Sequence, residues 1–272
     1  MGLIAGILNF KGQSTTCNEL LKRMRLVQQH RDDSNPIYYI TSYCGIVMSN
    51  QQNNCFDRKI THQQAGSEII PGVVAFVDGI VLDVQKHAQY FEQRGYGLSV
   101  RSGSSIIAAA YKEWGKDFRK HLEGEFACVV WDETEKTLLL SRDPYGHKPL
   151  HYSFFQGSVL FSSEAKGILA AGVPPEVDLI SISDYLSLNC IPNPTTIFRH
   201  IRQVAPGETI IVNSERLLHH VYWVPMFEVD YTLKLDDIVI QMSDVIRNAV
   251  KKRIIHDEVY CFLSGGVDSS LV

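Results

Sequence analysis

The segment 126–131, Phe126-Ala127-Cys128-Val129-Val130-Trp131, is an apolar run, and Thr137-Leu138-Leu139-Leu140-Ser141 is a second one shortly after it. The polar stretch Asp132-Glu133-Thr134-Glu135-Lys136 joins them. Two apolar runs on either side of a short polar connection are typical of a β-hairpin. The sequence therefore predicts two antiparallel strands here.

Outward from this hairpin, similar patterns predict several more strands and a few helices. β-Branched and aromatic residues predict strands over residues 2–10, 37–48, 72–77, 150–155 and 158–161. A capping-box pattern at Thr16-Cys17-Asn18-Glu19 begins one helix, and further helices are expected over 84–94 and 104–121. Many strands with few helices between them favour a mixed α+β domain that extends to about Trp223.

The last part of the chain has a different pattern. Residues 192–206 are rich in proline and turn residues, which suggests the approach to a domain boundary. An amphipathic helix is expected over 235–253 and a strand over 259–263, followed by a Gly- and Ser-rich loop. This order is that of the beginning of a parallel α/β unit. We therefore expect two domains, residues 1–225 and residues 226–272.

Composition limits the class of protein. The 272 residues carry a net charge of −4, and their basic residues are scattered, so neither nucleic acid nor a membrane surface is an expected partner. No apolar stretch approaches the ~20 residues that a membrane-spanning helix needs. The six cysteines show no metal-binding or disulfide spacing. We expect reduced thiols in a cytoplasmic protein.

The final loop, Ser264-Gly265-Gly266-Val267-Asp268-Ser269-Ser270, has the features of a phosphate-binding turn. Glycines let backbone N–H groups approach phosphate oxygens, and serine hydroxyls add donors. A carboxylate would repel phosphate unless a cation lay between them, so Asp268 is the expected Mg²⁺ ligand. The stretch matches the S-G-G-x-D-S-S signature of PP-loop ATP pyrophosphatases, and an ordinary Gly/Ser turn is the alternative. The expected cofactors are ATP and Mg²⁺, held by Leu263, Ser264, Gly265, Gly266, Asp268, Ser269 and Ser270.

Four further motifs resemble those of the asparagine synthetase family. They are Leu122-Glu123-Gly124-Glu125-Phe126-Ala127, the segment from Ser141-Arg142-Asp143 to Leu150, Phe161-Ser162-Ser163-Glu164-Ala165-Lys166, and Pro194-Thr195-Thr196-Ile197-Phe198 with Pro206-Gly207. The resemblance implies a class II glutamine amidotransferase domain of the N-terminal-nucleophile type, an αββα sandwich of two antiparallel sheets. It also implies that an α/β PP-loop domain begins behind it, of which this chain holds a truncated start. In the family, that second domain adenylates a carboxylate, which an amine or ammonia then attacks.

The glutaminase motifs of the family are not preserved. Its nucleophile is a cysteine directly after the initiator Met, whose α-amine serves as base; Gly2 stands there, and Cys17 cannot supply a free α-amine. The Asn-Gly pair that holds the oxyanion is Asp78-Gly79, where a carboxylate would repel the developing charge. The acidic G-S-D-x-E motif aligns with residues 101–105, which contain no acid, and residues 47–52 lack the expected arginine. We therefore expect no glutaminase activity and no catalytic residue in the first domain.

Two functional readings follow from the resemblance. The first is an ATP-dependent amide-forming synthetase with an inactive glutaminase half, as in β-lactam synthetases, carbapenam synthetases and lasso-peptide cyclases. Its partners are ATP, a carboxylate substrate and an amine or ammonia. The second is a non-catalytic pseudo-amidotransferase that serves as scaffold or binding module. In either case we expect the 272 residues alone to be inactive, and a separately encoded synthetase half or a homo-oligomer to be a possible partner.

Overall fold

The structure is a computed structural model that describes residues 2–11, 17–31, 35–49, 70–98, 100–254 and 259–271. The chain divides into two compact units, Met1–Val224 and Pro225–Val272. Each unit is described by itself. The first contains all of the sheet structure among the described residues, and it carries the first candidate site.

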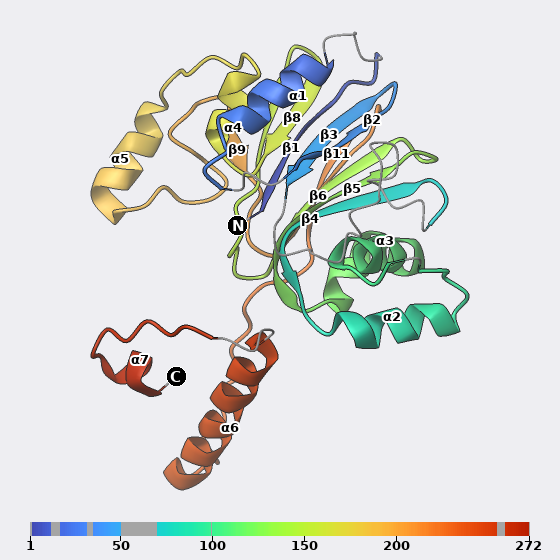
Figure 1. Cartoon of the computed structure of the whole chain (residues 1–272). Coiled ribbons are helices and arrows are strands. Elements are labelled where there is room, and N and C mark those ends of the chain that lie inside the picture. Colours follow the sequence, from blue (N-terminus) through green and yellow to red (C-terminus); the bar gives the residue numbers. More distant parts are fainter. Residues whose placement is uncertain are drawn as a thin grey trace. The chain divides into compact units, whose positions relative to one another are not determined.

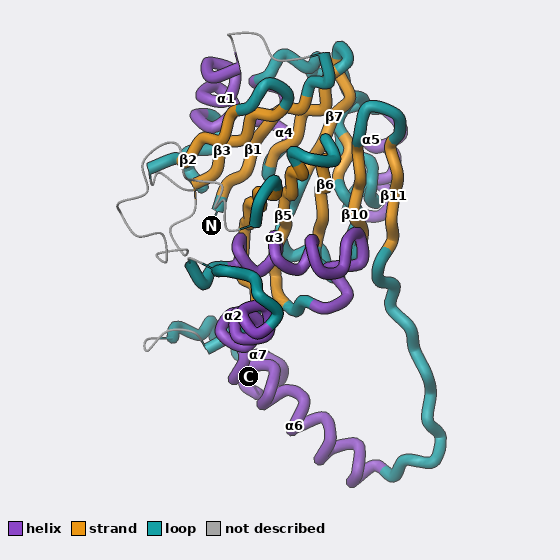
Figure 2. The backbone as a smooth tube through the Cα atoms, turned by 90° about the vertical axis from the view of Figure 1, so that its right-hand side faces the viewer, coloured by secondary structure: helices purple, strands orange, loops and turns teal. Residues whose placement is uncertain are grey.

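Two antiparallel sheets form the centre of the first unit (Figures 1 and 2). The first sheet has the order β2 (Ile37–Ile40), β3 (Cys44–Ser49), β1 (Leu3–Leu8), β8 (Ser158–Ser162), β7 (His151–Phe155) and β9 (Arg202–Gln203). The second has the order β11 (Leu217–Val221), β10 (Glu208–Val212), β6 (Thr137–Arg142), β5 (Gly124–Asp132) and β4 (Val73–Val81). The predicted hairpin is β5 and β6, which pair from Asp132–Thr137 onward.

Helices cover the outer face of each sheet (Figure 1). Helices α1 (Cys17–Leu26) and α4 (Ala165–Ala170) pack on the first sheet. Helices α2 (Val84–Gln93) and α3 (Gly103–Trp114), with the 3₁₀ helix η1 (Gly115–His121), lie on the side of the second. Two antiparallel sheets between helical layers are the αββα sandwich that the sequence predicts, and this part of the prediction is confirmed.

The alternation of side chains along each strand decides which residues face the space between the sheets. On β1 and β4, Ile4, Val74 and Phe76 lie in the core between the sheets, with Trp131 and Phe161 among their neighbours. Ala75 and Val77 instead pack toward α3. Burial of one such large apolar side chain stabilises the fold by roughly 1.5–3 kcal/mol. The same alternation places Asp78 on the inner face of β4, the face of Val74 and Phe76, and Gly2 directly precedes β1.

Three differences from the sequence prediction have local causes. The helix expected over 104–121 is interrupted at Gly115, whose φ of 56° ends α3 and starts η1. After the proline-rich stretch the chain returns to the second sheet as β10 and β11, since Ile210 and Val212 complete the core. Helix α5 (Leu179–Leu188) forms where no helix was predicted.

In the second unit, the predicted helix is confirmed as α6 (Leu235–Arg253). The predicted strand over 259–263 is wrong, because these residues form no ladder, and Phe262 is fully exposed. A strand forms its backbone hydrogen bonds with neighbouring strands. The described residues of this unit contain no strand with which residues 259–263 could pair. The short helix α7 (Val267–Leu271) follows the Gly-rich turn.

Five of the six cysteines lie in the part of the chain that the structure describes. There, Cys17, Cys44 and Cys128 are buried, Cys190 and Cys261 are exposed, and all five are free thiols. Cys55 lies outside this part. Among the described helices, none combines the length and the apolar character that crossing a bilayer requires.

Candidate functional site

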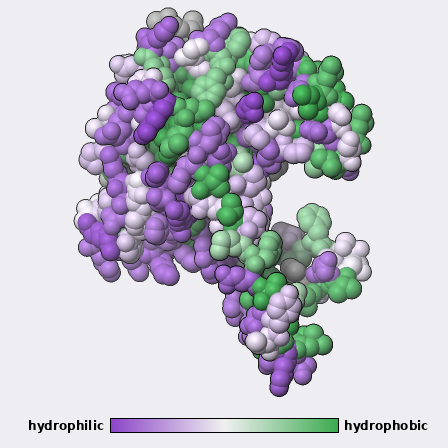
Figure 3. Space-filling view, turned by 180° about the vertical axis from the view of Figure 1, so that it is seen from behind, coloured by the Kyte–Doolittle hydropathy of each residue, from purple (hydrophilic) through white to green (hydrophobic). Residues whose placement is uncertain are grey.

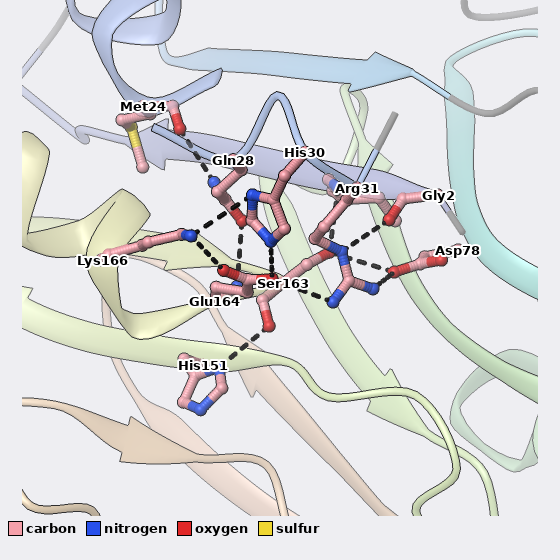
Figure 4. A network of polar contacts seen from close by, with 11 residues as sticks. Gly2, Met24, Gln28, His30, Arg31, Asp78, His151, Ser163, Glu164 and Lys166 are labelled. Atoms are coloured by element: carbon pink, nitrogen blue, oxygen red, sulfur yellow. Dashed lines mark hydrogen bonds and ion pairs between the residues drawn. The ribbon is translucent and has the colours of Figure 1, made fainter. Parts of the chain in front are cut away.

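Gly2 and Asp78 lie at the same end of the sandwich, on the strands expected to carry a nucleophile and an oxyanion site. Gly2 directly precedes β1, and Asp78 is on β4. One side chain joins them, since Arg31 donates from Nε to the carbonyl oxygen of Gly2 at 2.9 Å and from Nη2 to Asp78 Oδ2 at 2.9 Å (Figure 4). The guanidinium therefore lies between the two positions.

Arg31 and Asp78 form a buried ion pair. The Asp78 side chain is completely buried and that of Arg31 is only 7% exposed. Arg31 comes from the turn after α1, and its Nη1 also contacts Glu164 Oε1 at 3.3 Å. Its guanidinium thus contacts the start of β1, the inner face of β4 and the residues after β8. Three contacts of this kind fix a planar guanidinium in one orientation.

Burial dominates the electrostatics of Asp78. It raises the pKa of the carboxyl group, while the charges of Arg31 and Lys148 and a hydrogen bond from Ser163 oppose the rise. Ser163 Oγ donates to Asp78 Oδ2 at 3.2 Å and accepts from the Ile4 backbone N–H at 3.0 Å. The other carboxylate oxygen, Oδ1, is buried without a hydrogen-bond partner among the described residues. Arg31 and Ser163 both donate hydrogen bonds to Asp78. An oxyanion site requires hydrogen-bond donors, whereas the Asp78 carboxylate is an acceptor.

Glu164 anchors the other end of the network. Its Oε1 contacts His30 Nε2 at 3.0 Å, and its Oε2 contacts Lys166 Nζ at 3.0 Å (Figure 4). Burial alone would raise the pKa of Glu164, but the hydrogen bonds from Lys166 and Arg31 outweigh it and lower the pKa. The backbone N–H of Glu164 donates to Gln28 Oε1 at 3.0 Å. Glu164 therefore stays ionised and shares Arg31 with Asp78.

His151 lies beside Ser163 and is neutral at physiological pH. Burial lowers its pKa to about 4. Its Nδ1 lies 3.1 Å from the carbonyl oxygen of Ser163, so Nδ1 carries the proton and donates to that oxygen. This contact fixes the backbone that presents Ser163 to Asp78.

No buried cysteine of the described residues lies near Gly2. Cys17 packs with Ala5 and Val47 on the outer face of the first sheet, which is the opposite side of β1 from Ile4. Cys44 faces the inner core but pairs with Leu8, at the far end of β1 and roughly 20 Å from Gly2 at the strand rise. Burial raises the pKa of the Cys128 thiol to about 12. Burial also raises the pKa of the Cys44 thiol, so Cys44 and Cys128 stay protonated, and Cys128 packs in the apolar cluster under α3 on the outer face of its sheet.

The remaining positions of the expected glutaminase site have structural roles. Gly79 has φ 119°, and an added Cβ would lie 2.1 Å from the Glu125 carbonyl oxygen, so only glycine fits there. Ser102 caps α3 by accepting from the Ser105 N–H at 3.2 Å, and Arg101 pairs with Glu92 on α2. The aligned segment 47–52 lies partly outside the described residues.

The loop of the second unit is exposed. Leu263, Ser264, Gly265 and Gly266 precede α7, which contains Asp268, Ser269 and Ser270. Gly265 has φ 81°, as a glycine-dependent turn requires, and Ser264 Oγ lies 2.9 Å from Ser269 Oγ. These features fit a phosphate cradle. Within the residues that the structure describes, no group of three potential metal ligands surrounds Asp268 or any other position.

Comparison with known proteins identifies the family. The family model for the glutamine amidotransferase domain matches residues 1–223. The chain belongs to this family. More specifically, it contains a glutamine amidotransferase-like domain of the asparagine synthetase family.

Relatives and solved structures agree with this assignment. Asparagine synthetase [glutamine-hydrolyzing] 1 of Bacillus subtilis is 26% identical over 262 residues, which cover 96% of this chain and 41% of the relative. Amidase chry2 of Gibberella zeae is 34% identical over 207 residues, 74% of this chain and 30% of the relative. The glutamine phosphoribosylpyrophosphate amidotransferase of B. subtilis has the same fold, with a TM-score of 0.56 at 15% identity over 83% of this chain and 50% of that chain. The chain spans about two fifths or less of the length of these curated relatives.

Sequence reasoning found the two key strand positions but missed the side chains that surround them. Arg31, Ser163 and His151 were not among the expected site residues. Ser163 and Glu164 belong to the motif 161–166, which carried a family signal without any indication of contact with Asp78. Arg31 gave no signal in the sequence, because only the fold brings its turn to β4.

Proposed function

We propose that this chain is the amidotransferase-like half, with the beginning of the nucleotide-binding half, of an ATP-dependent amide-forming synthetase, and that its glutaminase site is inactive. The observation that carries the proposal is the Arg31–Asp78 ion pair in contact with Gly2. In a working site of this type, these positions present a thiol and oxyanion donors. Here they present a backbone carbonyl and a carboxylate, both of them acceptors.

The electrostatics of the network support the same conclusion. Glutamine hydrolysis develops negative charge on the amide oxygen, and Asp78 adds a second negative charge at the place where that oxygen is stabilised. Arg31 could neutralise an oxyanion, but it is already engaged by Gly2, Asp78 and Glu164. Loss of the nucleophile alone lowers the rate by roughly a millionfold. A substrate amine or free ammonia therefore takes the place of glutamine-derived ammonia.

The second part of the proposal rests on the loop from Leu263 to Ser270. Its sequence signature, the turn at Gly265 and the exposed hydroxyls support binding of the phosphates of ATP. Asp268 would hold Mg²⁺ together with phosphate oxygens and further ligands. The bound nucleotide would activate a carboxylate by adenylation, after which the amine forms the amide bond. The names of the asparagine synthetase relatives support this reaction class.

The second reading, a non-catalytic scaffold, is favoured by one specific observation. Helices α6 and α7 contain no buried residue, and residues 259–263 form no strand. A loop without a supporting sheet holds nucleotide weakly. By themselves, these residues therefore support at most weak ATP binding and no turnover, and a non-catalytic role would leave the first unit as the functional part.

The experiment that tests the proposed function measures glutamate release from glutamine and labelling by 6-diazo-5-oxo-norleucine. We expect release at the level of a no-enzyme blank and no covalent adduct in the mass spectrum. Asparagine synthetase 1 of B. subtilis, which is named as glutamine-hydrolyzing, serves as the positive control. A covalent adduct on this chain, or release above the blank, would overturn the proposal.

A further inference from the structure

A groove opens at the end of the sandwich opposite to Gly2. It has a volume of about 370 Å³ and lies between the β7–β8 turn of the first sheet and the β10–β11 turn of the second. Phe10, which follows β1, also lines it. Because the six residues of β1 span roughly 20 Å, the groove is separate from the network around Asp78.

The floor and the sides of the groove are apolar. Val159 and Val212, each 3% exposed, form the floor and belong to the core between the sheets. Phe10, Phe154 and Leu217 line the sides. Figure 3 shows the side of the first unit on which β11 lies, and apolar side chains gather at its upper left. Phe154 is 49% exposed and Leu217 41%, so an apolar ligand group placed here would remove both from water.

The β10–β11 turn adds two opposite charges to the lining of the groove, Glu215 and Arg216. Asn213 fixes this turn, since its Oδ1 accepts from the N–H groups of both residues at 3.0 Å. The Asn213 N–H donates in turn to the Arg216 carbonyl oxygen at 3.1 Å. Both charged side chains are exposed, and neither forms an ion pair or a side-chain hydrogen bond with any residue that the structure describes. Both are therefore available to a ligand.

Adjacent charges of opposite sign favour a ligand that carries both signs. A simple anion would meet Glu215 next to Arg216, and a simple cation would meet Arg216 next to Glu215, so attraction and repulsion would largely cancel. A zwitterion can place its carboxylate at Arg216 and its ammonium group at Glu215. The apolar sides then fit an uncharged, apolar side chain. The volume is near the lower end of the range for small-molecule sites, which suits a ligand of about the size of one amino acid.

We propose that this groove binds a free α-amino acid with an apolar side chain. Its carboxylate pairs with Arg216, its ammonium group pairs with Glu215, and its side chain contacts Phe10 and Phe154, against which an aromatic ring packs edge to face. Because residues of both sheets line the groove, the bound amino acid stabilises the folded sandwich. The inference goes beyond the proposed function and does not depend on it.

The test is an NMR titration of the isotope-labelled chain with L-phenylalanine. We expect saturable shifts of the backbone signals of the two turns, with a Kd of about 1 mM or below. Phenylpropanoate lacks the ammonium group and phenylethylamine lacks the carboxylate, so each should bind at least fivefold more weakly. Arg216→Gln and Glu215→Gln should each raise the Kd for L-phenylalanine at least fivefold.

Arg202→Gln is the matched control, since Arg202 is an exposed arginine of β9 outside the groove. It should change the Kd by less than about twofold. Thermal unfolding verifies that each variant is folded, and L-phenylalanine should raise the midpoint of the wild type and of Arg202→Gln more than that of Arg216→Gln.

Three results would overturn the inference. The first is the absence of saturable shifts in the two turns at up to about 20 mM L-phenylalanine. The second is equal affinity for phenylpropanoate, or equal affinity of the wild type and Arg216→Gln, because recognition would then not require both charges. The third is equally tight binding of the peptide Ala-Phe-Ala with blocked termini, which would make a peptide segment the occupant. Glutamate release and ATP titration involve other residues, so failure here is distinguishable from failure of the proposed function.

Discussion

The region around Gly2 and the loop around Asp268 differ in what each preserves. Around Gly2, the two sheets, the buried strand ends and the glycine at position 79 are all in place, but acceptors and a salt bridge occupy the reactive positions. Around Asp268, the residues of the phosphate-binding signature are complete, but they lie on an exposed segment without a sheet. The first region keeps the fold of the family with different side chains at the expected reactive positions, and the second carries the residues of the proposed nucleotide site on an exposed segment.

This difference shows that a sequence motif can be preserved without the surrounding fold, and a fold can be preserved without the reactive side chains. The motifs around 122–150 and 161–166 identify the family because they build the sandwich, whatever happens to the reaction. Reactive chemistry depends on a few side chains, and the two that contact Asp78 here, Arg31 and Ser163, lie outside the helices and strands. The following experiments test whether the network around Gly2 is as firmly structural as the comparison implies.

Removal of the charge of Arg31 should have the largest effect on stability. In Arg31→Met, Asp78 loses its cation while it remains buried, and uncompensated buried charges destabilise folds by about 3–5 kcal/mol. Urea unfolding followed by circular dichroism measures the free energy of unfolding. The matched control is Arg101→Met, which breaks a half-exposed pair with Glu92 and should change stability by less than about 1 kcal/mol.

The double variant Arg31→Met/Asp78→Asn sharpens this test. Because it removes both charges, it should recover a large part of the stability that Arg31→Met loses. Equal destabilisation in the single and the double variant would mean that Arg31 acts through packing and its contact with Gly2, and the electrostatic account of this region would be wrong.

The pH dependence of stability should carry a signature of His151. Its folded-state pKa of about 4 lies below the ordinary 6.5, so between these values the unfolded chain binds more protons than the native one. The free energy of unfolding should therefore fall as pH drops from 6.5 to 4, by about 1–3 kcal/mol from this group. His151→Asn keeps an N–H donor near Ser163 but cannot titrate, so its profile should be flatter than that of wild type.

Asp78 acts in the opposite direction at lower pH. Its pKa is raised above the ordinary 3.8 in the native state, so above about pH 3.8 the native protein binds more protons at this group than the unfolded chain does. The free energy of unfolding therefore falls as pH rises through this range. Comparison of wild type with His151→Asn at each pH cancels this contribution. Parallel profiles of the two proteins would contradict a neutral, buried His151.

The experiments on Arg31 and His151 concern residues that sequence reasoning did not find, and the reason is physical. Gly2 and Asp78 were chosen from the family resemblance, and the strand predicted over 72–77 ends one residue before Asp78, whereas β4 extends to Val81. The contact of Arg31 with Asp78 joins a turn after α1 to the inner face of β4. These residues are 47 positions apart in the sequence, and local sequence patterns do not predict contacts between such distant residues. The strand over 259–263 was wrong for a related reason, since its apolar residues fit a strand only where neighbours exist.

In the second unit the expected effect is smaller. Calorimetry with ATP–Mg²⁺ should detect at most weak binding, which Asp268→Ala reduces because the cation loses a carboxylate ligand. Asp244→Ala removes an exposed carboxylate of α6 and is the matched control, which should leave binding unchanged. Tight ATP binding by this chain, or binding insensitive to Asp268→Ala, would show that the loop functions differently from a PP-loop.

The most direct test of the account is glutaminase activity in the single variant Gly2→Cys, with removal of Met1 verified by mass spectrometry. The variant restores a terminal thiol and amine, but Asp78 and the Arg31 network still occupy the remaining positions. The account predicts glutamate release close to that of the wild-type chain and of a no-enzyme blank. Substantial release of glutamate by Gly2→Cys would contradict it, because the surrounding residues would then be competent for catalysis.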